Sequence, residues 1–159
     1  MEAASFREGE RSRAINPYLA ALLLITTALV QSSVMPDFAL RGMIPDLMLL
    51  VVVSWSLLRG PAEGLGLALS GGVLLDLFSG GPVAAATISL PLASMATTAS
   101  QNALARGFIW LPLAASVLAT TVYDAIYLLI LRIAGRPIAW GPSFLQVVLP
   151  AMVLNALLM

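Results

Sequence analysis

The sequence has little charge for its length. Charged residues make up only 10% of its 159 residues, whereas 60% are hydrophobic, and the mean hydropathy is +0.96. A soluble domain of this size carries about 25% charged residues. The chain therefore has too few polar groups to cover a water-facing surface, and lipid must cover much of it. The composition predicts a single integral membrane domain.

Three residue types with reactive side chains are absent. The chain has no cysteine and no histidine, and all eight of its basic residues are arginine. These absences exclude disulfides, thiol chemistry and the usual zinc ligands. Without histidine, cysteine or lysine, no nucleophile can be paired with a base. The net charge of zero argues against nucleic acid as a partner. We therefore expect no catalytic residues, no metal and no cofactor, and a protein that acts by contact.

Long apolar runs account for most of the chain. Arg7, Arg11 and Arg13 precede the first run, which predicts that residues 1–16 form a cytoplasmic tail. A cleaved signal peptide would show the same order of charge and apolar run, and is the alternative. The pattern predicts an all-α, six-transmembrane-helix bundle as one domain over residues 17–159, with membrane lipid around it. The predicted spans are about 17–35, 45–58, 62–78, 83–102, 108–131 and 143–159.

The third run carries a strip of small residues. Gly64, Ala68, Gly72 and Asp76 are spaced four apart, so a helix places them on one face. Small residues let another helix approach closely inside a membrane. That helix belongs either to this chain or to a partner, and we choose Gly64, Ala68 and Gly72 as the partner-facing candidates. The fourth run is rich in alanine, serine and threonine, which favours the bundle centre.

Two acidic residues lie at the ends of predicted helices. Asp46 falls in the first turn of the second span, where the helix dipole favours an anion, so capping and a functional role are both open. Asp76 lies at the unfavourable C-terminal end of the third span. We interpret it as a clamp that accepts hydrogen bonds from the turn formed by Ser79, Gly80 and Gly81, which shapes the outer surface.

A third acid, Asp124, lies well within the fifth apolar run and shares a face with Ser116 and Thr120. An intramembrane acid marks function by default, whereas the structural alternative is a hydrogen bond to a tyrosine or serine on a neighbouring helix. Asp46, Asp76 and Asp124 could also form a metal site or a proton relay, although their spacing does not select either.

One segment resembles a known family. Pro45-Asp46-Leu47 opens the second span, Arg59-Gly60 and Glu63-Gly64 follow, and the helix ends in residues 71–80, GGVLLDLFSG. This pattern, a glycine-bearing helix that ends in Leu-Asp-x-x-Ser-Gly, resembles the rod shape-determining membrane protein MreD family over roughly residues 44–82. The remainder agrees with the family in hydropathy.

The resemblance implies a multi-pass protein of the bacterial inner membrane that serves as a scaffold of the cell-elongation machinery. Its implied partners are MreC, the single-span periplasmic scaffold, then the RodA glycosyltransferase and a class B penicillin-binding transpeptidase, and the MreB filament inside the cell. At fold level, the family is similar to the six-helix substrate-binding subunits of energy-coupling-factor vitamin transporters. A small-molecule uptake subunit of that type is the alternative function, and a proton-coupled carrier that uses Asp124 is a third.

Overall fold

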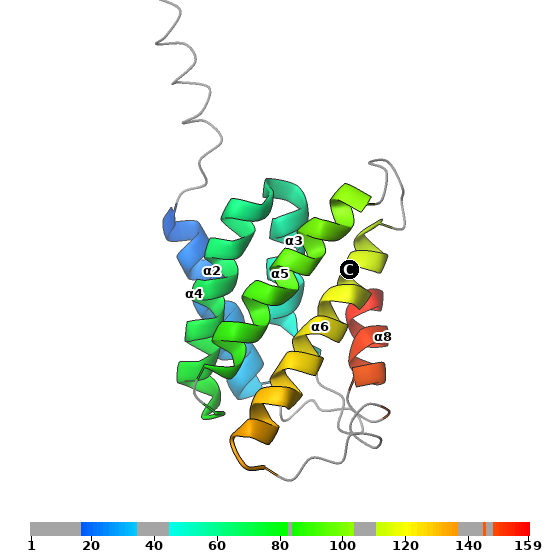
Figure 1. Cartoon of the computed structure of the whole chain (residues 1–159). Coiled ribbons are helices and arrows are strands. Elements are labelled where there is room, and N and C mark those ends of the chain that lie inside the picture. Colours follow the sequence, from blue (N-terminus) through cyan, green and yellow to red (C-terminus); the bar gives the residue numbers. More distant parts are fainter. Residues whose placement is uncertain (1–16, 35–44, 83, 104–110, 137–144, 146–147) are drawn as a thin grey trace, which may run out of the picture.

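The computed structural model describes residues 17–34, 45–82, 84–103, 111–136, 145 and 148–159. Within these residues all regular secondary structure is helical, with six α-helices, the π-helical turn η1 and no strand, which confirms the all-α prediction (Figure 1). The elements are α2 (Pro17–Leu29), η1 (Val30–Val34), α3 (Leu47–Arg59), α4 (Pro61–Ser79), α5 (Ala85–Ala103), α6 (Leu111–Ile133) and α8 (Leu149–Leu158).

Most helix ends lie within three residues of the predicted spans. The predicted tail 1–16 and the first part of the sixth span, 143–144, lie outside the described residues. Pro150 lies in the first turn of α8. A proline is tolerated there because the first helical N–H groups have no intrahelical partner.

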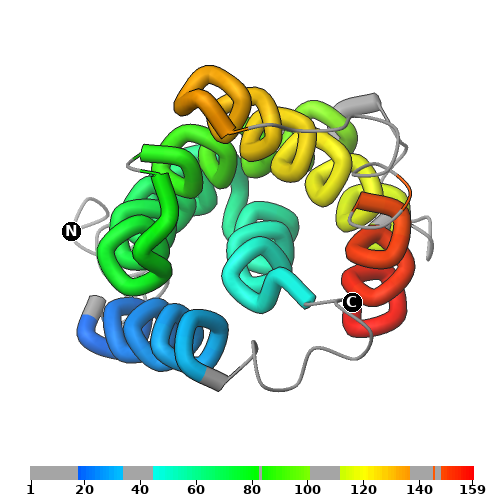
Figure 2. Tube along the Cα trace, turned by 90° about the horizontal axis from the view of Figure 1, so that it is seen from below, coloured from blue at the N-terminus to red at the C-terminus, as the bar shows by residue number. Residues whose placement is uncertain are grey.

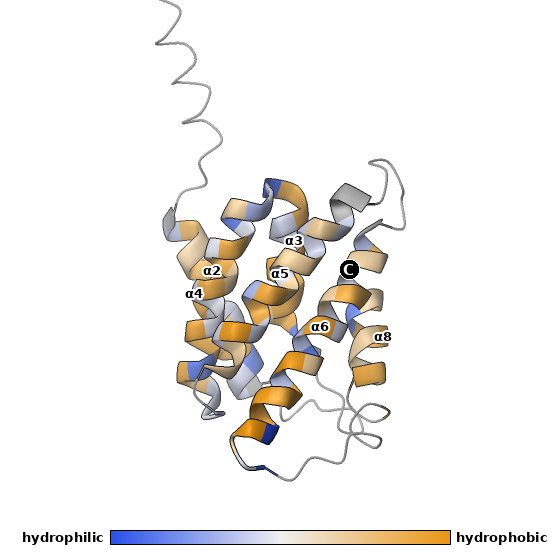
Figure 3. Ribbon diagram, in the orientation of Figure 1, coloured by the Kyte–Doolittle hydropathy of each residue, from blue (hydrophilic) through white to orange (hydrophobic). Residues whose placement is uncertain are grey.

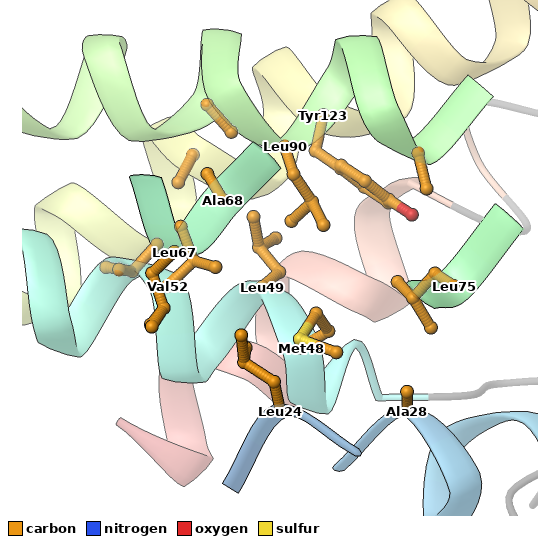
Figure 4. Packing of buried hydrophobic residues seen from close by; sticks show 14 of the residues in the cluster. Leu24, Ala28, Met48, Leu49, Val52, Leu67, Ala68, Leu75, Leu90 and Tyr123 are labelled. Carbon is orange, nitrogen blue, oxygen red and sulfur yellow. The ribbon is translucent and has the colours of Figure 1, made fainter. Parts of the chain in front are cut away.

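Helix α3 is the central helix of the bundle. Viewed from the end, α2, α4, α5, α6 and α8 form an arc around it (Figure 2). Its apolar residues reach most sides of the helix, and Met48, Leu49, Val52 and Val53 are buried. In Figure 4, Leu49 and Val52 lie among side chains of the surrounding helices. We expected the fourth span to lie at the centre; that was wrong, because the short α3 fits inside the arc and α5 packs beside it.

Helix α5 turns a polar but satisfied face inward. Its four-spaced residues Ala85, Ser89, Ala93 and Thr97 are fully buried. The Ser89 hydroxyl donates to the carbonyl of Ala85 at 2.7 Å, and the Thr97 hydroxyl to that of Ala93 at 2.9 Å. Because each hydroxyl bonds within its own helix, a face of small polar residues can be buried without an unsatisfied donor.

The glycine strip of α4 packs against the chain's own helices. A Cβ atom added at Gly64 would overlap the Ser56 side chain on α3. One added at Gly72 would lie 2.6 Å from Cα of Thr87 on α5, and Ala68 is fully buried. The prediction that this strip receives a partner's helix is therefore wrong for this fold. The alternative, close packing within one chain, is what the structure shows.

The outside of the bundle is apolar. Leu77, Ile133 and Leu157 expose 72, 78 and 78% of their surface, and hydrophobic colour predominates along the helices in Figure 3. Such a surface suits lipid better than water. Among the described residues, Pro61–Ser79 and Pro112–Ile133 are long and apolar enough to cross a membrane, whereas α2 with η1, α3 and α8 are apolar but shorter. The count of six spans stays a prediction.

Substituting Gly72 with alanine tests the close approach of α4 to α5. The added Cβ meets backbone atoms of Ala86 and Thr87, which cannot rotate away, so we expect a loss of about 1–3 kcal/mol in unfolding free energy. Gly66→Ala is the matched control on the same helix, because nothing lies within 4 Å of its Cβ position. Thermal unfolding in detergent measures both variants. Equal melting temperatures for the two would contradict the packing.

Candidate functional site

The carboxylate of Asp76 joins the end of α4 to the start of α5. Its Oδ1 accepts a hydrogen bond from the backbone N–H of Ala86 at 2.9 Å. Its Oδ2 accepts from the backbone N–H of Thr87 at 3.0 Å and from the Thr87 hydroxyl at 2.6 Å. Asp76 therefore caps the N-terminus of the following helix, where the helix dipole favours an anion.

The predicted clamp is thus present with different donors. We expected the N–H groups of the Ser79, Gly80 and Gly81 turn to bind Asp76, whereas the donors lie in the first turn of α5. Ser79 is the last residue of α4, and Gly80 follows in the left-handed conformation with φ of 60°. A Cβ at Gly81 would lie 3.1 Å from the hydroxyl of Tyr127, so the turn passes close to α6.

Asp46 precedes α3 without capping it. Its side chain makes no capping hydrogen bond, which corrects the expectation of a carboxylate cap. Gln31 on η1 supplies the cap in its place, because its Oε1 accepts from the Met48 backbone N–H at 2.7 Å. The Gln31 amide also donates to Oδ1 of Asp46 at 3.2 Å. The Gln31 side chain therefore connects the start of the central helix α3 to η1, the turn that follows α2.

Asn155 makes a second polar link to the start of α3. Its Oδ1 accepts from the Asp46 backbone N–H at 3.2 Å, and its Nδ2 donates to the Thr120 hydroxyl at 3.1 Å. Through these two bonds the fully buried Asn155 joins α8 to the start of α3 and to α6. Neither Gln31 nor Asn155 was among our site candidates. The signal available in the sequence was a lone amide side chain within an apolar run.

Asp124 lies one helical turn after Thr120, on the buried face of α6. Ser116, Thr120 and Asp124 are all buried, which agrees with the predicted shared face and shows that this face points inward. Oδ2 of Asp124 has no hydrogen-bond partner among the described residues. In the described part of the chain, no tyrosine or serine donates to that oxygen, so the structural alternative is not seen there. Within the described residues no group of three acidic side chains could hold a metal ion.

A second small-residue stripe runs along the opposite face of α4. Gly66 and Ser70, one turn apart, are exposed, and the Ser70 hydroxyl donates to the Gly66 carbonyl at 2.9 Å. They line an open groove of about 660 Å³ between α2 and α4. Ala20 and Ala21 line the other wall. The four-residue spacing of Gly66 and Ser70 was visible in the sequence, but spacing alone does not tell an inward stripe from an outward one.

Replacing Asp76 with asparagine tests the clamp between α4 and α5. An amide offers one oxygen and turns an NH₂ group toward the three donors, so we expect a loss of about 1–3 kcal/mol in unfolding free energy. Thr87→Val removes one of the three donors and should cost less. Thermal unfolding in detergent would measure both variants. An Asp76→Asn protein as stable as the wild type would show that the carboxylate does not hold the turn.

Comparison with known proteins identifies one family. The model of the family described as rod shape-determining protein MreD matches residues 12–159, far beyond the segment that carries the recognisable motif. No curated protein and no solved structure matches the chain. The expected likeness to energy-coupling-factor subunits accordingly stays a prediction. By a match over nearly its whole length, the chain belongs to the MreD family of rod shape-determining proteins.

Proposed function

We propose that the chain is a non-enzymatic scaffold of the bacterial cell-elongation machinery, which binds the transmembrane helix of an MreC partner. Membership of the MreD family gives a role in rod-shape determination and association with the membrane. Through MreC, the scaffold would help to organise RodA and its class B penicillin-binding transpeptidase, with MreB filaments on the cytoplasmic side. It would be a multi-pass protein of the inner membrane with its N-terminus in the cytoplasm.

The observation that carries the proposal is the outward face of α4 beside α2. The inward glycines are occupied by this chain, so a partner helix needs another small-residue surface. Gly66 has open space beyond it, and the wall of the groove opposite is formed in part by Ala20 and Ala21. In lipid, tight packing and interhelical hydrogen bonds hold helices together, at about 1 kcal/mol or less for a polar contact. Because Gly66 has no side chain, a partner helix can approach the backbone of α4 closely at this position.

Ser70 adds a polar contact to this surface. Its hydroxyl hydrogen is directed to the Gly66 carbonyl, which leaves the oxygen as an acceptor at an exposed position. The remaining wall is apolar and includes Ile25, Leu69 and Val73. A single-span helix with one hydroxyl or small side chain at its centre fits such a surface. The groove between α6 and α8, at about 410 Å³, is smaller and is lined almost wholly by larger apolar side chains.

Filling the groove tests the proposal. Gly66→Leu places a branched side chain where the partner helix would lie, and we expect at least a tenfold loss in MreC co-purification, which corresponds to about 1.4 kcal/mol. The matched control is Ala156→Leu, which adds the same kind of side chain to the groove between α6 and α8. Pull-down from membranes with tagged protein, quantified against the amount of bait, measures the loss.

The melting temperature of each purified variant separates lost binding from lost fold. Gly66→Leu should melt near the wild type, because its Cβ position is open. A Gly66→Leu protein that still recovers MreC at the wild-type level would overturn the assigned face. If Ala156→Leu alone lost the partner, the contact would lie between α6 and α8.

A further inference from the structure

One buried acid in the bundle has no described hydrogen-bond donor. Asp124 exposes 7% of its surface, and its Oδ2 is buried without a hydrogen-bond partner among the described residues. An ionised carboxylate in such a position is unfavourable unless donors or a cation compensate it. Asp76 shows the compensated case in the same bundle, because three donors surround its oxygens.

The charged surroundings of Asp124 are acidic. Asp46, at the start of α3, is close enough for its charge to act on Asp124. On α6 itself, Tyr123 and Tyr127 stack at 5.8 Å between ring centroids, and Asp76 on α4 acts on both of them. The packed helices α5 and α8 contain no titratable residue. Of the arginines, Arg136 beyond the end of α6 acts on Tyr127.

The hydroxyl and amide oxygens that link η1, α3, α6 and α8 already take part in hydrogen bonds, which disfavours their use as ligands of a metal cation. The Thr120 hydroxyl donates to the Ser116 carbonyl and accepts from Asn155. Oδ1 of Asn155 accepts from Asp46, and Oε1 of Gln31 accepts from Met48. A hard cation needs several free oxygen ligands, whereas a proton needs only one carboxylate oxygen.

We propose that Asp124 is a proton-binding site, and that the folded protein holds one proton on this carboxyl opposite the ionisable Asp46. The proton removes the charge that no described donor compensates and ends the repulsion between the two carboxylates. The start of α3 and the middle of α6 can then stay together. Loss of the proton places two negative charges between the central helix and its neighbour, and weakens that contact. This inference is independent of the proposed partner.

Infrared spectroscopy of the purified full chain in lipid vesicles tests the proton directly. A protonated carboxyl group has a carbonyl stretch that a carboxylate lacks. We expect this band at neutral pH in the wild type, its loss in Asp124→Asn, and its retention in the control Asp76→Asn, whose carboxylate is satisfied by three donors. A wild type without the band, or a band lost in Asp46→Asn and kept in Asp124→Asn, would overturn the assignment.

Thermal stability against pH gives a second readout. The unfolded chain releases the proton above about pH 3.9, the ordinary value for aspartate, while the folded chain keeps it. The folded state then binds more protons, so stability falls as pH rises. We expect the wild-type melting temperature to fall from mildly acidic to mildly alkaline pH, and that of Asp124→Asn to change much less. If added sodium stabilised the wild type and pH did not, the site would hold a cation and the proposal would fail.

Discussion

The close approach of α4 to its neighbours is the constraint on which the rest of the bundle depends. Gly64 meets Ser56 and Gly72 meets the backbone of α5, each at a distance that leaves no room for a Cβ, and Gly71 lies against the Met48 side chain. In lipid there is little hydrophobic drive to bring helices together, so dispersion over short distances must do so. Because α4 touches both α3 and α5, this contact also sets the position of the central helix.

Satisfied polar groups then secure the helix ends. Asp76 caps α5, Gln31 caps α3, and Asn155 connects α8 to α3 and α6. Asp76 and Gln31 each accept from a backbone N–H in the first turn of a later helix, which that helix itself cannot satisfy, and Asn155 accepts from the backbone N–H of Asp46 and donates to the Thr120 hydroxyl. In a low-dielectric interior such bonds matter more than on a wet surface, because the unpaired alternative is costly. Among the buried acids of the described residues, Asp124 stands outside this scheme.

The two faces of α4 have different surroundings. Its inward face packs against α3 and α5, while Gly66 and Ser70 on its outward face remain exposed beside α2. The proposed scaffold role needs such an open face, because a surface that is filled by its own chain cannot recruit another protein. The family to which the chain belongs acts in rod-shape determination, a role that is consistent with contact and with the scarcity of reactive groups.

The sequence by itself determined the membrane class, the helical content, the approximate helix ends and the family, because hydropathy, proline and glycine positions and a short motif are local properties. It also determined that Asp124 shares a helix face with Ser116 and Thr120, and the structure decided that this face points inward. Only the tertiary structure decided which helix is central, that the glycine strip of α4 packs against α3 and α5, and that Gln31 rather than Asp46 caps α3. Helical spacing defines a face but not its neighbour, since the neighbour depends on how all the helices share the available volume.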